Sequence, residues 1–325
     1  MEVVGGGSVV EYGHRDEIAH ESSDNEFWQE SVVAFWWDTD NKIGGYHRIG
    51  HEPNYRDGPS ISLWNNIFTQ EFIYKDACTL SLRIEDRLSN GFGAGDTCRF
   101  EFTDHAIWTV NAPEVRADIH IHDLHTPVDV YPKKGAVGDD FSPNHMEVAG
   151  KVSGTLDVKG KHYQIKGLAF RDHGWGKRDW SVIVSHRWIA ATFENGTMVL
   201  MHTFHAQNNE FVQFGCLIRD NKLTYAKDLD ILTFVEADGL THRGGCATMT
   251  LVTGEVMNFD FAPLQKGVVS WMHGISCVDT FCKVTCGHLT GLADFETTNN
   301  AMRGGYRPYF AINAIEKNGL HKIEG

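Results

Sequence analysis

The sequence is poor in the features that mark several large classes of protein. Positive charge is scarce, with 29 Lys and Arg against 43 Asp and Glu and a formal net charge of −14. Binding to phosphate backbones needs a basic face, so nucleic acid is not expected as a partner. Apolar runs are broken every few positions by a charge or a glycine, and none approaches the roughly 20 residues of a membrane span.

Targeting signals and paired cysteines are also missing. The first residues carry an acid where a secretory signal carries bases, and no apolar segment follows. Seven cysteines at irregular positions do not suggest a disulfide framework, which favours a reducing, cytoplasmic location. Cys277, Cys282 and Cys286 lack the Cys-x-x-Cys pair of structural zinc sites, so we expect buried, small hydrophobic residues there.

Helical periodicity is nearly absent, and the chain instead alternates between apolar and polar residues in short segments. In Val115 to His122 every second residue is apolar, which predicts a strand with one face in the core. Turn residues between alternating segments predict hairpins. These hairpin turns are Lys159-Gly160, Asn195-Gly196, Asp220-Asn221 and Thr253-Gly254.

The pattern therefore predicts an all-β fold. Its 325 residues exceed the usual size of one core, and 16 to 20 strands of ordinary length would suit two barrels or sandwiches. The segment from Val128 to Pro143 carries Pro and Gly without any period, so we place the domain junction there. The expected division is an N-terminal arm (1–25), a first β-domain (26–140) and a second β-domain (141–325).

The densest group of chemically active side chains is the segment from Arg171 to Trp180 (RDHGWGKRDW). On a strand Arg171, His173 and Trp175 project to one side and Asp172 to the other, and the two glycines would permit a bulge. His173 is either a general acid or base, or a core imidazole held by an Asp or a backbone carbonyl. The charged residues are more readily structural, as salt bridges that fix the bulge.

Other histidines offer weaker patterns. His120, His122 and His125 invite a metal hypothesis, but no defined ligand motif accompanies them and we expect no metal. His202 alternates with Leu200 and Phe204 on an apolar face, which makes it either a satisfied core histidine or a polar group inside the barrel. Gly91-Phe92-Gly93-Ala94-Gly95 resembles a nucleotide loop only superficially, because no helix N-terminus follows it to bind phosphate.

The motif Arg171-Asp172-His173-Gly174-Trp175-Gly176, followed by Arg178-Asp179-Trp180, resembles a known signature. It is the Arg-Asp-His-x-Trp-Gly signature of the lipocalin-like proteins related to hydroxyneurosporene synthase (carotenoid 1,2-hydratase) and the AttH group. Glu26–Ser31, His47–Gly50 and Glu52–Asn54 resemble the first domain of an uncharacterised branch of that superfamily. The resemblance runs from about Glu26 to Ala314.

The resemblance implies two tandem lipocalin-like barrels and chemistry without a dissociable redox cofactor. The superfamily includes hydratases of acyclic terpenoids and fungal cyclases called Diels–Alderases. In the hydratases the His and Trp of the motif are implicated, which by position are His173 and Trp175. Those hydratases also use a Tyr and an Asp on a following strand, where this chain has Leu200-Met201-His202-Thr203 instead.

We therefore expect a lyase (hydratase or dehydratase) or an isomerase that moves a proton at a carbon–carbon double bond or an enone of a terpenoid, steroid-like or polyketide substrate. A Diels–Alderase-like cyclase and a non-catalytic carrier of an apolar ligand stay open. The oligomeric state is also open, with a homodimer as one option. The expected catalytic residues are His173, Trp175 and His202; the expected substrate-binding residues are Trp36, Trp37, Arg171 and Trp188; and the expected structural residues of the motif are Asp172, Arg178, Asp179 and Trp180.

Overall fold

The computed structural model describes residues 1–5, 9–236, 241–300, 306–307 and 315–322. The described residues are almost entirely strand, with four one-to-two-turn helices, so the all-β prediction is confirmed. The chain forms two compact units. We call Val10–Asp129 with Ser142–Arg178 the sheet unit, and Met1–Val9, Val130–Phe141 and Asp179–Gly325 the barrel unit.

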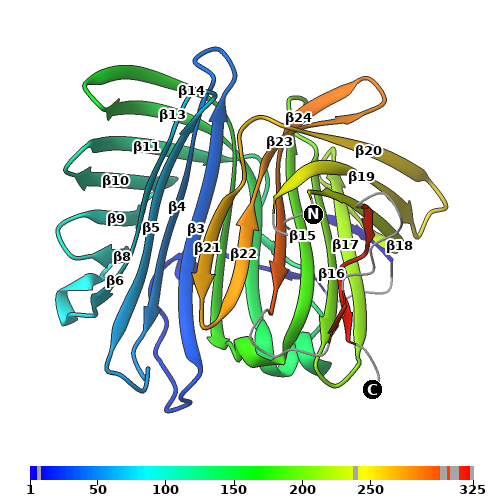
Figure 1. The fold of residues 1–325 in the computed structure, drawn as a ribbon, viewed down its shortest axis with the longest axis horizontal. Coiled ribbons are helices and arrows are strands. Elements are labelled where there is room, and N and C mark those ends of the chain that lie inside the picture. The colour runs from blue at the N-terminus through cyan, green and yellow to red at the C-terminus, as the bar shows by residue number, and fades with distance from the viewer. Residues whose placement is uncertain (6–8, 237–240, 301–305, 308–314, 323–325) are drawn as a thin grey trace. The chain divides into compact units, whose positions relative to one another are not determined.

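The sheet unit is one long antiparallel sheet that curls without closing (Figure 1). Its strand order is β6-β5-β4-β3-β14-β13-β11-β10-β9-β8-β7, with β12 and β2 added beside β13. Its elements are β2 (Val10–Glu11), η1 (His14–Glu17), β3 (Trp28–Asp38), β4 (Ile43–Glu52), β5 (Ser60–Thr69), β6 (Ile73–Ser81), η2 (Ile84–Asp86), β7 (Arg87–Leu88), β8 (Gly91–Ala94), β9 (Cys98–Phe102), β10 (Ala106–Ala112), β11 (Val115–Asp123), β12 (Val128–Asp129), β13 (Asn144–Val158) and β14 (Lys161–Lys177).

The barrel unit contains a closed ring of strands, β15-β16-β17-β18-β19-β20-β23-β24, which β24 completes by pairing with β15. β1 and β26 add to β18, and the β21–β22 hairpin adds to β24. Its elements are β1 (Glu2–Val4), η3 (Ala136–Phe141), η4 (Trp180–Val182), β15 (Ile183–Phe193), β16 (Met198–Ala206), β17 (Phe211–Arg219), β18 (Lys222–Val235), β19 (His242–Leu251), β20 (Val256–Pro263), β21 (Val268–Met272), β22 (Ile275–Asp279), β23 (Phe281–Cys286), β24 (Leu289–Asn299), β25 (Tyr306–Arg307), β26 (Ile315–Lys317) and β27 (His321–Lys322). A closed barrel and a curled half-barrel are the tandem lipocalin-like architecture that the sequence predicted.

Each unit has its own hydrophobic core, built by strand alternation. In β11 the predicted apolar face is buried, with Ile119 and Ile121 fully inside the core of the sheet unit. In the barrel unit Ile189 of β15 and Met201 of β16 lie in the core, so their sequence neighbours Trp188 and His202 face the other side of the barrel wall. His202, which was expected to be a core histidine or a polar group inside the barrel, is 1% exposed on this face and packs against Phe204 and Phe214.

The division into units differs from the expected domains. The segment from 142 to 178, which carries the Arg171 to Trp175 motif, belongs to the sheet unit because β14 pairs with β3 and β13 pairs with β11. Within the Pro- and Gly-bearing segment, Val130–Phe141 belongs to the barrel unit, and the chain re-enters the sheet unit at Ser142. Ala314, the expected end of the family resemblance, lies outside the described residues.

Candidate functional site

Strand β14 presents the motif with regular alternation. Its pairing with β3 continues without a register shift through Gly174 and Gly176, and its pairing with β13 does so up to Trp175, so the predicted bulge is wrong. The glycines are explained by close approach instead, since a Cβ on Gly174 would lie 2.8 Å from His145 Nδ1. The register sets Glu30 of β3 opposite Trp175 and therefore diagonal to His173 on the same face.

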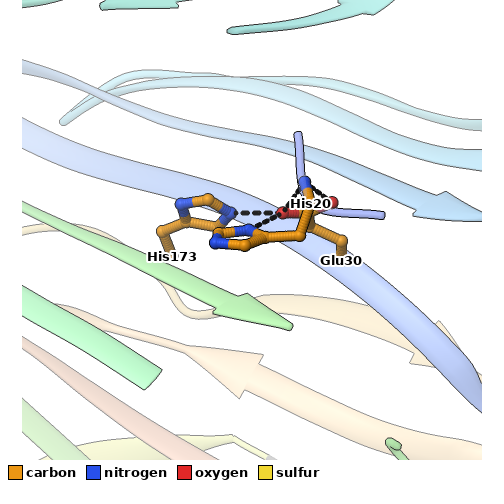
Figure 2. Close-up of side chains that lie close together, drawn as sticks. All are labelled: His20, Glu30 and His173. Atoms are coloured by element: carbon orange, nitrogen blue, oxygen red, sulfur yellow. Dashed lines mark hydrogen bonds and ion pairs between the residues drawn. The ribbon is translucent and has the colours of Figure 1, made fainter. Parts of the chain in front are cut away.

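A carboxylate held between two imidazoles is the centre of the candidate site (Figure 2). Glu30 Oε1 lies 3.0 Å from His173 Nε2 and 2.7 Å from His20 Nδ1. The His20 backbone N–H also donates to both oxygens of Glu30, each at 3.0 Å. The side chains of Glu30 and His173 are each 1% exposed, so the pair is out of water.

The electrostatics of Glu30 favour the ionised carboxylate. Burial raises the pKa of Glu30, but hydrogen bonds from His173 and His20 outweigh it, and the pKa lies below the ordinary value. An ionised carboxylate only accepts hydrogen bonds, so Nε2 of His173 carries a proton. In a neutral ring Nδ1 then carries the lone pair, and it has no hydrogen-bond partner among the described residues. The result is a buried, oriented base.

Aromatic rings surround this base. Trp175 stacks on His20, with ring centroids 4.0 Å apart and planes 9° apart, and its centroid is 5.0 Å from that of His173. Phe92 meets His173 edge to face at 5.2 Å. Tyr12 lies edge-on to Trp175 at 5.2 Å. The ring of His173 is therefore packed among aromatic side chains.

The segment before β3 supplies His20 and is tied to β14 by buried ion pairs. Arg171 donates to both carboxylate oxygens of Glu17, at 2.7 and 2.8 Å, and from Nε to Asp123 Oδ1 at 2.9 Å. The side chain of Arg171 is 2% exposed, and its guanidinium N–H groups donate to these two carboxylates. Arg171, which was expected to bind substrate, thus anchors the segment that carries His20.

A second polar group lies on the opposite face of β14. His145 Nε2 is 3.3 Å from Glu147 Oε1 and 3.9 Å from Asp172 Oδ2. Burial raises the pKa of Asp172 to about 7, with Glu147 adding to this and His145 and Arg178 opposing it. Asp172 and Arg178 both lie close to His145 on this face of the sheet unit.

The remaining predicted residues are distributed over both units. Trp36 is fully buried and donates from Nε1 to His47 Nε2 at 3.1 Å. Trp37, the next residue on β3, faces the other side of the sheet, so the two tryptophans cannot line one wall together.

In the barrel unit Trp188 pairs in register with His202, whose ring lies 4.9 Å from that of His186. Asp179 caps η4 through the Ser181 N–H at 2.9 Å, and Trp180 packs edge to face on Phe141 at 5.1 Å. Both therefore have local structural contacts.

The three histidines of the discarded metal hypothesis do not converge. His120 and His122 share a face of β11 and gather with His105, whose Nε2 lies 2.7 Å from His120 Nδ1. His125 instead bonds to the Thr126 carbonyl at 2.9 Å. His20, Glu30 and His173, by contrast, have ligand atoms within 4.8 Å of one another. Two imidazoles and one carboxylate could also hold a divalent metal, so a metal is an alternative that experiment must separate from acid–base chemistry.

Sequence reasoning found His173 and Trp175 but missed Glu30 and His20. Glu30 stands in an apolar strand, WQESVVAFWWD, where an acid on the core-facing side is a signal in itself, because a buried carboxylate needs a partner. His20 lies in the segment expected to be an irregular arm, and nothing in its local pattern marks it.

The fold and this site define a lipocalin-like double β-domain protein with a buried imidazole–carboxylate centre. The chain belongs to the family described as a domain of unknown function (DUF7064), whose model matches residues 13–301. No curated protein matches the chain. No helix in the described part of the chain is both long enough and apolar enough to cross a membrane.

Solved structures share the fold at low sequence identity. A putative AttH from Nitrosomonas europaea aligns with a TM-score of 0.66 and 14% identity, covering 92% of this chain and 99% of that one. Kievitone hydratase from Nectria haematococca aligns with a TM-score of 0.61 and 11% identity, covering 90% and 93%. CghA, in a crystal structure with Sch210972, aligns with a TM-score of 0.62 and 10% identity, covering 84% and 89%. The resemblance to AttH-type proteins that the motif indicated is confirmed.

Proposed function

We propose that this protein is an enzyme that hydrates, dehydrates or isomerises a hydrophobic substrate by proton transfer through His173. The observation that carries the proposal is the buried Nδ1 of His173, which lacks a hydrogen-bond partner while Glu30 holds the opposite ring nitrogen at 3.0 Å. A general base needs such an oriented lone pair and a group that stabilises the charged ring after it takes the proton.

In this mechanism Glu30 fixes the Nε2–H tautomer and pairs with the imidazolium that forms. For isomerisation, Nδ1 removes a proton beside a carbonyl or a double bond, the electron pair shifts, and the imidazolium, after exchanging its proton with solvent, delivers a proton at the new position. For hydration, the imidazolium protonates one alkene carbon, water bonds to the neighbouring carbon, and the proton that water loses restores the catalyst. The face of Trp175 beside His173 would stabilise cationic character, on the order of 1–2 kcal/mol in a dry site.

The class of substrate is supported by the aromatic surroundings of His173 and by the names of two relatives in fold. One relative is a hydratase and another was crystallised with the compound Sch210972. Terpenoid, steroid-like and polyketide enones or alkenes are therefore the substrates to test first. The predicted roles of His202 and Trp188, which belong to the barrel unit, stay predictions, and so does a cytoplasmic location.

The test begins with native mass spectrometry of the purified protein, to identify any apolar ligand that remains bound. That ligand and a panel of terpenoid, steroid-like and polyketide enones are then incubated in D2O and in water labelled with oxygen-18. Deuterium at carbon without oxygen-18 supports isomerisation, and oxygen-18 together with deuterium at carbon supports hydration. An unlabelled, rearranged product points to a cyclase, and an unchanged ligand points to a carrier; both outcomes contradict the proposal.

Variants then locate the chemistry. His173→Gln should lower turnover by about 10²- to 10⁴-fold, the range of general acid–base catalysis. His162→Gln is the matched control, since His162 lies on the same strand but is exposed. Full activity of His173→Gln would contradict the role of His173 as the general acid or base. Turnover that a chelator abolishes and a divalent metal restores would replace the acid–base centre with a metal centre on the same three side chains.

A further inference from the structure

A second group of metal-binding side chains lies in the barrel unit, where three strands meet. Cys277 of β22 pairs in register with Thr298 of β24, and Thr298 pairs in register with His186 of β15. Side chains two residues apart on a strand share a face. Asp279 and Glu296 are therefore on the same face as Cys277 and His186.

Three of these side chains lie close together, and His186 contacts one of them. Ligand atoms of Cys277, Asp279 and Glu296 lie within 4.8 Å of one another. Cys277 Sγ is 4.0 Å from Asp279 Oδ1, and His186 Nε2 is 2.5 Å from Glu296 Oε1. Cys277 is 4% exposed, Asp279 is fully buried, and the His186 and Glu296 side chains are 6% and 14% exposed.

This combination of atoms suits zinc. Thiolate sulfur, imidazole nitrogen and carboxylate oxygen are the ligands that Zn²⁺ binds in proteins, commonly four at a time in a tetrahedron. Bonds of about 2.0–2.3 Å separate tetrahedral ligand atoms by about 3.3–3.8 Å, so small side-chain movements would bring these atoms into place. Calcium and magnesium are disfavoured by the sulfur and nitrogen ligands.

The charge and polarity of the group also point to a cation. Two carboxylates and a thiol share a buried face, where His186 contacts Glu296, and buried acids are normally paired or bound to metal. An independent observation comes from β21. Ser270 stands directly opposite Cys277, is 2% exposed, and its hydroxyl has no hydrogen-bond partner among the described residues. A polar group next to Cys277 would thus gain a partner from a metal centre or its bound water.

We propose that His186, Cys277, Asp279 and Glu296 form a Zn²⁺ site that pins the β21–β22 hairpin to β24 and β15. The site is separate from the imidazole–carboxylate centre of the sheet unit, and its role is structural. The proposal therefore stands or falls independently of proton transfer by His173.

The experiment uses the full-length protein after removal of metals with a chelator, titrated with Co²⁺ as a spectroscopic probe and with Zn²⁺. We expect one equivalent of Co²⁺ to produce a thiolate-to-cobalt charge-transfer band, which Zn²⁺ then displaces. Zn²⁺ in excess over its dissociation constant should raise Tm by on the order of 5 °C, because a metal bound only to the folded state stabilises it. Absence of the band would overturn the proposal.

Variants test which residues bind. Cys277→Ser, which is nearly isosteric, should abolish the charge-transfer band and the rise in Tm, and Glu296→Gln should weaken Zn²⁺ binding at least tenfold. Cys282→Ser is the matched control, because Cys282 is a fully buried cysteine of the neighbouring β23 and should leave the band unchanged. His105→Asn removes one histidine of the group formed by His105, His120 and His122, and it should also leave the band unchanged.

Far-ultraviolet circular dichroism without metal shows whether each variant keeps its fold. A band that survives in Cys277→Ser, or disappears equally in Cys282→Ser, would contradict the proposed ligands.

Discussion

Because of Glu30, we expect the free energy of unfolding to depend on pH in the acid range. Its carboxylate is buried, and its pKa is lowered because hydrogen bonds from His173 and His20 outweigh the effect of burial. A group whose pKa is lower in the folded state stabilises the protein above its unfolded pKa of about 4.3, and that contribution is lost as the pH falls through the folded value. We predict that Glu30→Gln lowers the free energy of unfolding at pH 7 by about 1.5–3 kcal/mol, and by less at pH 3.

Urea unfolding of both proteins between pH 3 and pH 7 measures this difference. Glu255→Gln is the control, since Glu255 pairs with Arg219 at the surface, both side chains being 41% exposed. Such exposed pairs contribute about 0–1 kcal/mol. A difference between wild type and Glu30→Gln that stays constant from pH 7 to pH 3 would show that the carboxylate is not held in its ionised form.

At the scale of residues, the sequence predicted the centre of the site but not its partners. His173 and Trp175 were found because ten consecutive residues concentrate charge, imidazole and indole. Glu30 reaches His173 through the pairing of β3 with β14, and His20 lies in a segment that Glu17 ties to Arg171 of β14, more than a hundred residues away in sequence. A local pattern carries no information on such pairing, since it follows from which strands the whole chain brings together.

Strand β14 depends on a glycine that approaches another segment. Gly176 has φ +117°, in the region that favours glycine, and a Cβ there would lie 2.5 Å from Pro143 Cγ. Gly160, in the β13–β14 turn, has φ +77° and nothing within 4 Å of a Cβ. We predict that Gly160→Ala costs about 1–2 kcal/mol of backbone strain, and that Gly176→Ala costs a further 1–3 kcal/mol, roughly, from overpacking.

Equilibrium unfolding in urea of the two alanine variants gives the comparison directly, and Gly160→Ala serves as the control for backbone strain alone. Equal losses in the two variants would mean that Pro143 moves aside without cost. A regular β14 would then have no steric need for glycine at position 176.

At the scale of elements, hairpins were predictable and the interior of β14 was not. All four predicted turns join paired strands, and both Asp220 and Asn221 adopt the positive φ that a two-residue hairpin requires. Turn chemistry is local, so it is visible in the sequence. The two glycines of the motif were interpreted as a bulge. Gly174 instead leaves room for His145 of β13, and Gly176 leaves room for Pro143, the residue before β13. Both contacts join residues about thirty positions apart in sequence.

At the scale of the molecule, the alternation of apolar and polar residues predicted the class of fold. It did not predict which segments of the chain belong to which unit. The loss of period between Val128 and Pro143 does mark a passage between units. The return of β13 and β14 to the sheet unit has no local signal, because it depends on edges that β3 and β11 present to them. Strands that pair regardless of sequence distance are typical of curled antiparallel sheets.

This interleaving predicts how the chain behaves when it is divided between residues 140 and 141, the boundary expected from the sequence. The fragment 1–140 would keep β3 and β11 but lose β14, which pairs with β3, and β13, which pairs with β11. Two long strands would then each have an unpaired edge, which favours aggregation. We expect each fragment expressed alone to be insoluble or to lack cooperative unfolding. Expressed together, with an affinity tag on fragment 141–325, the two should copurify in equal amounts, because β14 pairs with β3 from Leu168–Trp37 to Lys177–Trp28. Two fragments that fold separately and do not associate would show that the boundary at 140 separates independent domains, and would contradict the strand order on which the candidate site depends.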